Sequence, residues 1–210
     1  MFRIPQKEVE AFRVKYRFEL REVAKRKKFE PSEIEKFFYI FHKLSKSREK
    51  IISREKFIEI IDFLINFDKE YLRQRVLVVL TEVKDDGSID PAVWMRTMEI
   101  FFGRSLKDKI EYCFQVYDID NSGNILKDDV FKFLNGCFTM KSMRQEEIAV
   151  KDLIQRIFGK FRAKVNHKIT KEEYKDGVLK TPLMLECLGQ CLPQIDSKQF
   201  FDLLLSQKII

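Results

Sequence analysis

Residues 118–129 carry oxygen-bearing side chains at the alternating positions that a divalent cation requires. Ca²⁺ takes about six to eight oxygen ligands, and a twelve-residue loop supplies them from positions 1, 3, 5, 7 and 12. The sharp turn at position 6 needs glycine, which is Gly123 here. The segment therefore predicts one calcium-binding loop. The five candidate ligands are Asp118, Asp120, Ser122, Asn124 through its backbone carbonyl, and Asp129.

Two positions of this loop predict a weak site. Position 12 is Asp129, which is one methylene shorter than glutamate and reaches an ion less easily with both oxygens. Position 9 is Leu126, which cannot orient a bridging water. Six-coordinate Mg²⁺ thereby becomes competitive. Two interpretations stay open: a modest Ca²⁺ site, or a loop that is empty or filled by Mg²⁺ at resting ion levels.

The segments on either side of this loop have helical periodicity. Ile110, Phe114 and Tyr117 form an apolar stripe before the loop. Val130 and Leu134 begin a similar stripe after it. A helix, a twelve-residue loop and a second helix make up an EF-hand unit.

This unit repeats along the chain. Ile52, Ile89, Ile125 and Ile169 each follow a short polar stretch between apolar helical patterns, at spacings of 37, 36 and 44 residues. The repeat predicts three further loops that lack the carboxylate ligands of a calcium site. They lie at 45–56, 82–93 and 162–173. Basic side chains such as Lys84, Arg162 and Lys164 stand where carboxylates belong, so we expect these loops to be metal-free.

Length and composition agree with an all-α fold. The chain has 210 residues, and its seven Gly and five Pro are too few for the turns of a β-sandwich. We expect four EF-hand units paired into two lobes by short β-bridges, plus N-terminal and C-terminal helices. The expected divisions are 1–30 (a basic amphipathic helix), 31–102 and 103–180 (the lobes), and 181–210 (a helical tail, with 183–192 helical).

The formal net charge of +7 is unevenly distributed. Basic side chains cluster near the N-terminus and in the fourth loop, which favours acidic partners. A solvated surface remains the alternative at both places. The candidate partner-binding residues are Lys25, Arg26, Lys27, Lys28, Lys160, Arg162, Lys164 and Lys168.

Several function classes lack a signal. No apolar stretch is long enough to span a membrane, and one polybasic stretch is a single signal, so we expect no stable membrane anchor. No nucleophile–base pair, phosphate-cradling loop or catalytic metal cluster is visible, so we expect no enzyme. We also expect no nucleic-acid partner. Cys187 and Cys191, with no nearby histidine, make a poor zinc site.

Three segments resemble one family. The stretch Leu106–Asp129, which includes Tyr112–Asp118, is similar to the third EF-hand of neuronal-calcium-sensor-like proteins, within the superfamily that also holds calcineurin-B-like proteins. Phe101–Leu106 and Glu186–Pro193 narrow the resemblance to calaxin-like proteins, over roughly residues 33–195. The resemblance implies a cytoplasmic protein of the ciliary or flagellar axoneme, associated with the outer dynein arm. Its implied partners are dynein-arm docking proteins and tubulin of the doublet microtubule.

The leading interpretation is therefore a non-enzymatic axonemal adaptor with weak or vestigial calcium sensing. Calaxin-like proteins usually keep more than one usable loop, and this chain keeps one. A first alternative is a soluble calcium-sensor subunit that binds a helix of an enzyme or channel. A second is a membrane-surface module that uses the basic N-terminal helix.

Overall fold

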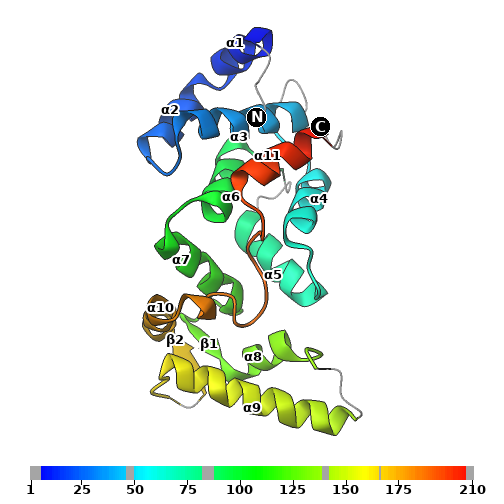
Figure 1. Cartoon of the computed structure of the whole chain (residues 1–210), viewed down its shortest axis with the longest axis vertical. Helices are drawn as coiled ribbons and strands as arrows, with labels where there is room; N and C mark the ends of the chain where they lie inside the picture. Colours follow the sequence, from blue (N-terminus) through cyan, green and yellow to red (C-terminus); the bar gives the residue numbers. More distant parts are fainter. Residues whose placement is uncertain (1–5, 46–49, 82–87, 139–141, 166, 207–210) are drawn as a thin grey trace. The chain divides into compact units, whose positions relative to one another are not determined.

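A computed structural model describes residues 6–45, 50–81, 88–138, 142–165 and 167–206. The described chain is mostly helical with one small antiparallel sheet (Figure 1), which confirms the predicted all-α fold. The helices are α1 (Gln6–Lys15), α2 (Arg17–Lys25), α3 (Pro31–Leu44), α4 (Arg54–Ile65), α5 (Glu70–Thr81), α6 (Pro91–Phe102), α7 (Leu106–Tyr117), α8 (Lys127–Leu134), α9 (Met143–Phe161), α10 (Lys171–Lys180) and α11 (Ser197–Ser206). The other elements are strands β1 (Asn124–Leu126) and β2 (Lys168–Thr170) and the 3₁₀ turn η1 (Pro182–Met184).

The chain forms two compact units whose bounds differ from the expected lobes. Unit 1 combines residues 1–66, 80–105 and 192–210, and unit 2 combines 67–79 with 106–191. The N-terminal helices and α11 thus belong to the compact unit that holds the first two loops. Most of α5, the entering helix of the second loop, belongs to unit 2.

Side chains of α5 and the residue before it explain why residues 67–79 belong to unit 2. The Lys69 ammonium donates hydrogen bonds to the carbonyl oxygens of Phe133 and Asn135, at 2.7 and 3.0 Å. The ring of Tyr71 packs on that of Phe133 with centroids 5.4 Å apart. These contacts span more than sixty positions of sequence, so periodicity alone does not reveal them.

Aromatic side chains build the core of unit 1. Phe37 of α3 lies against Phe102 at the end of α6 and against Phe201 of α11, with centroids 5.7 and 4.8 Å apart. The indole N–H of Trp94 donates to the carbonyl oxygen of Phe37 at 3.0 Å. Figure 1 shows α11 beside α3 and α6. The expected C-terminal helix therefore exists and closes this core.

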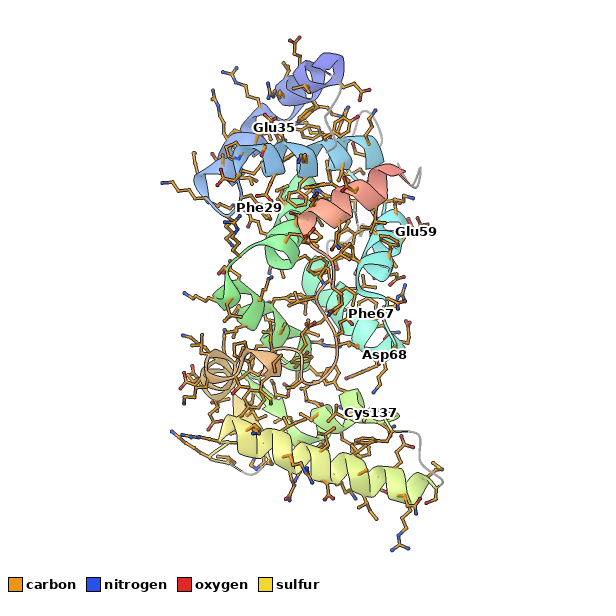
Figure 2. The ribbon with its side chains drawn as sticks, viewed as in Figure 1. Phe29, Glu35, Glu59, Phe67, Asp68 and Cys137 are labelled. Atoms are coloured by element: carbon orange, nitrogen blue, oxygen red, sulfur yellow. The ribbon has the colours of Figure 1, made fainter. Side chains whose placement is uncertain are left out.

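The N-terminal segment is two helices rather than the single amphipathic helix expected within residues 1–30. The backbone leaves helical geometry at Tyr16, and α2 ends at Lys25. The Tyr16 ring is fully buried, and its hydroxyl lies 3.3 Å from the Ser45 hydroxyl. On the outer face, the Arg13 guanidinium pairs with Glu35 at 2.7 Å, and Glu35 is labelled in Figure 2. The Tyr16 ring thus belongs to the core of unit 1 at the point where α1 and α2 meet.

Both predicted loop pairings are confirmed. Ile52 and Ile89 exchange backbone hydrogen bonds of 2.9 and 3.0 Å in unit 1. Ile125 of β1 pairs with Ile169 of β2 in unit 2, and both side chains are fully buried. Each isoleucine pair joins two loops by antiparallel backbone hydrogen bonds. The apolar side chains of the pair lie between the helices.

The tail segment 183–192 is a 3₁₀ turn followed by further turns, so the expected helix is wrong. Its carbonyls accept hydrogen bonds from buried tyrosine hydroxyls of unit 2 instead of from a helical ladder. Tyr174 donates to Leu185 at 2.5 Å, Tyr117 donates to Gly189 at 2.7 Å, and Tyr112 donates to Cys191 at 3.1 Å. Gly189 has φ +137°, and a Cβ there would lie 2.7 Å from the Leu72 side chain. Only glycine fits this turn.

The cysteines of the described chain are all free thiols. Cys113 and Cys191 are buried, with their sulfurs 3.3 Å apart, and Cys187 is half-buried. Burial raises the pKa of Cys187 to about 12. Cys137, labelled in Figure 2 beyond the end of α8, is exposed.

Candidate metal centre

The loop 118–129 is positioned by α7, which ends one residue before it, and by β1. The guanidinium of Arg75 caps the carboxyl end of α7. It donates to the carbonyl oxygens of Gln115, Val116 and Asp118 at 3.0, 3.2 and 3.0 Å. A cation at a helix C-terminus satisfies carbonyls that lack intrahelical partners. Arg75 therefore fixes the backbone of the first loop residue from a different helix.

Asp118 is the first residue of the loop and is 6% exposed. Its carboxylate accepts hydrogen bonds from the backbone N–H groups of Ser122 (3.0 Å) and Gly123 (2.9 Å). Burial raises the pKa of Asp118, and these two hydrogen bonds oppose the rise. Gly123 has φ +76°, the left-handed conformation that the turn requires. Without an ion, the loop thus folds around its first carboxylate.

The next three candidate ligands are connected to one another. The Asp120 carboxylate accepts from the Ser122 N–H at 3.1 Å, and hydrogen bonds from Ser122 lower the pKa of Asp120. The Ser122 hydroxyl donates to the Asn124 carbonyl at 3.4 Å, and the Asn124 amide donates to the Ser122 carbonyl at 3.0 Å. The Asn124 carbonyl is the predicted backbone ligand, so these contacts would rearrange on cation binding.

Asp129, at position 12, is paired with a lysine. Its side chain is 7% exposed, and its Oδ1 lies 2.8 Å from the Nζ of Lys132, one turn further along α8. The hydrogen bond to this carboxylate raises the pKa of Lys132. The fifth candidate ligand is thereby occupied by an ammonium group.

The donor set suits a hard cation. All the candidate ligands are oxygens, and carboxylates and carbonyls are what Ca²⁺ and Mg²⁺ prefer. Within the described residues, no group of three or more His, Cys, Asp or Glu side chains is gathered as for a bound metal. The residues fit the ion if Asp129 leaves Lys132 and joins Asp118 and Asp120. The ion would then neutralise carboxylates that now depend on N–H groups and a lysine.

The loop 162–173 is closed without an ion. Glu173 accepts from the backbone N–H groups of Lys164 (3.0 Å) and Thr170 (2.9 Å), and the Thr170 hydroxyl accepts from the Glu173 N–H (3.3 Å). Thr170 and Glu173 form a capping box at the start of α10. The carboxylate at position 12 thus accepts hydrogen bonds from backbone groups across the loop.

The first two loops also use side-chain caps. Ser53 accepts from the Lys56 N–H at 3.3 Å, and Asp90 accepts from the Val93 N–H at 2.9 Å. Both residues hold position 9 of their loops, as Thr170 does in the fourth. In 118–129 the same position is Leu126, which caps α8 with no side-chain hydrogen bond. Residues 46–49 and 82–87, which carry several of the lost ligand positions, lie outside the described residues.

The predicted partner-binding residues near the N-terminus are partly used within unit 1. Lys25 pairs with Glu22 at 2.5 Å. Arg26 and Lys28 contact the buried carboxylate of Glu99 at 3.2 and 3.5 Å. Lys27 is exposed, with φ 53°. Arg26 and Lys28 therefore anchor the turn after α2 on α6.

The predicted basic residues of the fourth loop lie mostly in solvent. Lys160, Arg162 and Lys164 are exposed, and Lys168 is half-buried in β2. Arg162 ends α9 in the left-handed conformation, with φ 53°. The end of α9 and the loop after it therefore present positive charge to solvent.

Two residues that sequence reasoning missed act directly on the candidate site. Lys132 follows Asp129 by three positions on a helix, a spacing that brings opposite charges together, so the sequence does contain this signal. Arg75 precedes Asp118 by 43 positions, and its role depends on the packing of α5. Nothing in the local pattern marks it.

Comparison with known proteins agrees with this geometry. Residues 107–179 match a family described as an EF-hand domain pair. Calaxin of Xenopus laevis is 28% identical over 82% of this chain and 84% of its own length. Calaxin of Homo sapiens is 29% identical over 56% of each chain, and calcineurin B-like protein 5 of Arabidopsis thaliana is 26% identical over 75% of this chain and 78% of its own. The chain is therefore a calaxin-like EF-hand protein with an EF-hand domain pair at residues 107–179.

Proposed function

We propose that this protein is a non-enzymatic EF-hand adaptor of the ciliary or flagellar axoneme, with one weak calcium site. The observation that carries the proposal is the contrast inside the EF-hand pair. Loop 118–129 presents only oxygen ligands, whereas loop 162–173 is closed by its own Glu173. A protein built this way keeps a folded scaffold at all calcium levels, and calcium modulates a single loop.

The axonemal part of the proposal rests on the similarity to calaxin. Under this proposal, the protein is cytoplasmic, lies at the outer dynein arm and joins docking-complex proteins to tubulin of the doublet microtubule. The exposed basic side chains of 160–164 suit an acidic protein surface. No helix among the described residues has the length and apolar character needed to cross a membrane.

Co-sedimentation with detergent-stripped axonemes tests the adaptor role. Changing Lys160 and Lys164 together to Glu should reduce retention, because two exposed cations become anions. The matched control changes Lys180 and Lys198, also exposed, to Glu and leaves retention unchanged. Binding should weaken as salt rises. Strong binding to anionic vesicles without axoneme binding would contradict the adaptor role and favour a membrane-surface module.

Calorimetry tests the calcium part. We expect at most one Ca²⁺ per chain, with a dissociation constant at the weak end of about 10⁻⁷–10⁻⁵ M or weaker, and measurable competition by Mg²⁺. Asp118→Ala should abolish binding, with the helical circular dichroism kept. Asp129→Glu should tighten binding, because the longer side chain reaches the ion with both oxygens. Two or more sites would contradict this assignment.

The similarity to calcineurin B-like protein 5 favours a second candidate function. In it, the protein is a soluble regulatory component that binds a helix of an enzyme or channel. Fractionation of ciliated cells separates the two functions. An adaptor stays with the axoneme after detergent extraction, and a soluble regulator is released with its target.

A further inference from the structure

Asp129 is a buried carboxylate whose partner in the metal-free loop is a lysine. The Asp129 side chain is 7% exposed, whereas the Lys132 side chain is 53% exposed and reaches it at 2.8 Å. Both residues lie in the first two turns of α8. The backbone of one helix therefore holds the pair, and the pair does not depend on the packing of other elements.

The ammonium group and a bound cation exclude each other at this carboxylate. A divalent ion at the loop needs the oxygens of position 12, and one of them is already hydrogen-bonded to Lys132. Like charges at contact distance repel, and this repulsion is strongest beside a buried group, where water screens least. Cation binding therefore has to displace the Lys132 ammonium into solvent.

We propose that Lys132 is a built-in competitor of the cation that sets the affinity of loop 118–129. Its charge stabilises the metal-free loop by pairing with Asp129 and weakens the metal-bound loop by repulsion. The inference deepens the proposed function, since it rests on 118–129 being the cation site. It also makes Lys132 a point of control: a modification that removes the charge, such as acetylation of the amine, would tighten ion binding.

The neighbouring loop lacks this competitor. Its position-12 residue, Glu173, accepts hydrogen bonds from the backbone N–H groups of Lys164 and Thr170. Those groups belong to the loop itself and cannot swing away into solvent as a lysine side chain can. The two carboxylates are therefore compensated in different ways, one by a fixed backbone and one by a movable charge.

The test compares three variants of the full chain with wild type. Lys132→Met removes the charge and nearly keeps the length of the side chain, and Lys132→Arg keeps the charge. The matched control is Lys151→Met, because Lys151 forms an exposed pair with Glu147 at 2.6 Å on α9 and does not belong to the loop. Each protein is titrated with CaCl₂ by calorimetry at low and at physiological salt. Its melting temperature is measured in chelator and in excess calcium.

We expect Lys132→Met to bind Ca²⁺ about three- to tenfold more tightly than wild type, with the larger gain at low salt. Its chelator-treated form should melt below wild type, because Asp129 stays buried without a partner. Calcium should then raise its melting temperature by more than it raises that of wild type. Lys132→Arg and Lys151→Met should bind calcium as wild type does.

Unchanged calcium affinity in Lys132→Met, with calcium binding intact in wild type, would overturn the inference and leave the proposed calcium site standing. If wild type binds no calcium, the calcium part of the proposed function fails instead. The inference is then decided by two readouts of Lys132→Met. The inference is supported if Lys132→Met binds calcium and melts below wild type in chelator. It is overturned if Lys132→Met binds no calcium and melts as wild type does in chelator. Equal tightening in Lys151→Met would assign the effect to net charge and would also overturn it.

Discussion

Loops 118–129 and 162–173 pair with each other through Ile125 and Ile169. In each loop a carboxylate accepts hydrogen bonds from backbone N–H groups, but the carboxylate holds a different loop position. In 162–173, the position-12 carboxylate of Glu173 draws the loop together through two backbone N–H groups. In 118–129, the position-1 carboxylate of Asp118 does so. An EF-hand loop thus keeps its shape without metal when a carboxylate at either end gathers the backbone. The residue at the opposite end of the loop then decides whether a cation can bind.

Position 9 sharpens the same contrast. Ser53, Asp90 and Thr170 cap the outgoing helices of the three loops that lack a full set of ligands. Leu126, in the loop with the ligands, offers no side-chain cap. A side-chain cap is worth about 1 kcal/mol, which helps to offset the loss of a stabilising ion.

The largest expected effect on stability comes from a substitution in the core on which both loops depend. Phe114 is 2% exposed, and its ring packs on Tyr174 at 5.7 Å. Phe114→Ala should lower the free energy of unfolding by about 3–5 kcal/mol, because it leaves a cavity between α7 and α10. Urea unfolding in chelator measures this loss. Leu183→Ala, at a side chain 92% exposed, is the control and should cost little.

The second prediction tests whether Glu173 replaces a metal. Glu173→Gln puts an NH₂ group opposite one of the two backbone N–H groups that the carboxylate now accepts from. We expect a loss of about 1–3 kcal/mol in the free energy of unfolding, because a backbone donor loses its partner. The control is Glu172→Gln, the exposed neighbour in the same turn. Equal losses in the two variants would mean that Glu173 does not close the loop.

A smaller effect is expected at position 9 of the fourth loop. Thr170→Val keeps the β-branched shape of β2 and removes the hydroxyl that accepts from the Glu173 N–H. The expected cost is about 1 kcal/mol, the usual value of a lost N-cap. Thermal unfolding measures it, with Thr181→Val as a threonine that caps no helix through its side chain. A neutral result at Thr170 would remove the position-9 part of the comparison.

The smallest effect distinguishes the two carboxylates by pH. Burial acts to raise the pKa of Glu173, but hydrogen bonds from Thr170 and Lys164 outweigh it, so the pKa is lowered. The stability that Glu173 contributes is therefore present above its unfolded pKa and is lost as pH falls through its folded pKa. Asp118 has a raised pKa, so its contribution is present at low pH and is lost as pH rises through the folded value.

Melting of the metal-free chain between about pH 6 and pH 3 checks these signs. Glu173→Gln should flatten the acid-induced loss of stability. Asp118→Asn should steepen it, because the relief that wild type gains by protonating Asp118 is gone. Shifts in the reverse direction for either variant would contradict the assigned roles.

The sequence predicts the parts of this fold that depend on local pattern. The ligand spacing of 118–129 and the repeated isoleucines give the helix–loop–helix units and both pairings, Ile52 with Ile89 and Ile125 with Ile169. These features follow from residues within one loop and its flanking helices. The pair Asp129–Lys132 is equally local. The ligand pattern alone misses it, because Lys132 lies in the helix that follows the loop.

The features that the sequence did not predict depend on distant packing. The break between α1 and α2 lies at Tyr16, whose ring is buried, and the carbonyls of the non-helical tail accept hydrogen bonds from distant tyrosine hydroxyls. The unit bounds follow from Lys69 and Arg75, which reach carbonyls about 40 to 66 positions away. Periodicity reports which face of a helix is apolar, and it does not report which helix that face meets.

The hydrogen bonds between the buried tyrosines and the tail set an order of events during synthesis. Tyr112 and Tyr117 find their acceptors at Cys191 and Gly189, more than seventy residues further along the chain. Until the ribosome has delivered those residues, these two hydrogen bonds cannot form, and the loss of a hydrogen bond by a buried hydroxyl is costly. Unit 2 therefore completes its core only after residue 191 has been synthesised. A nascent chain that stops at residue 180 should remain a target for chaperones.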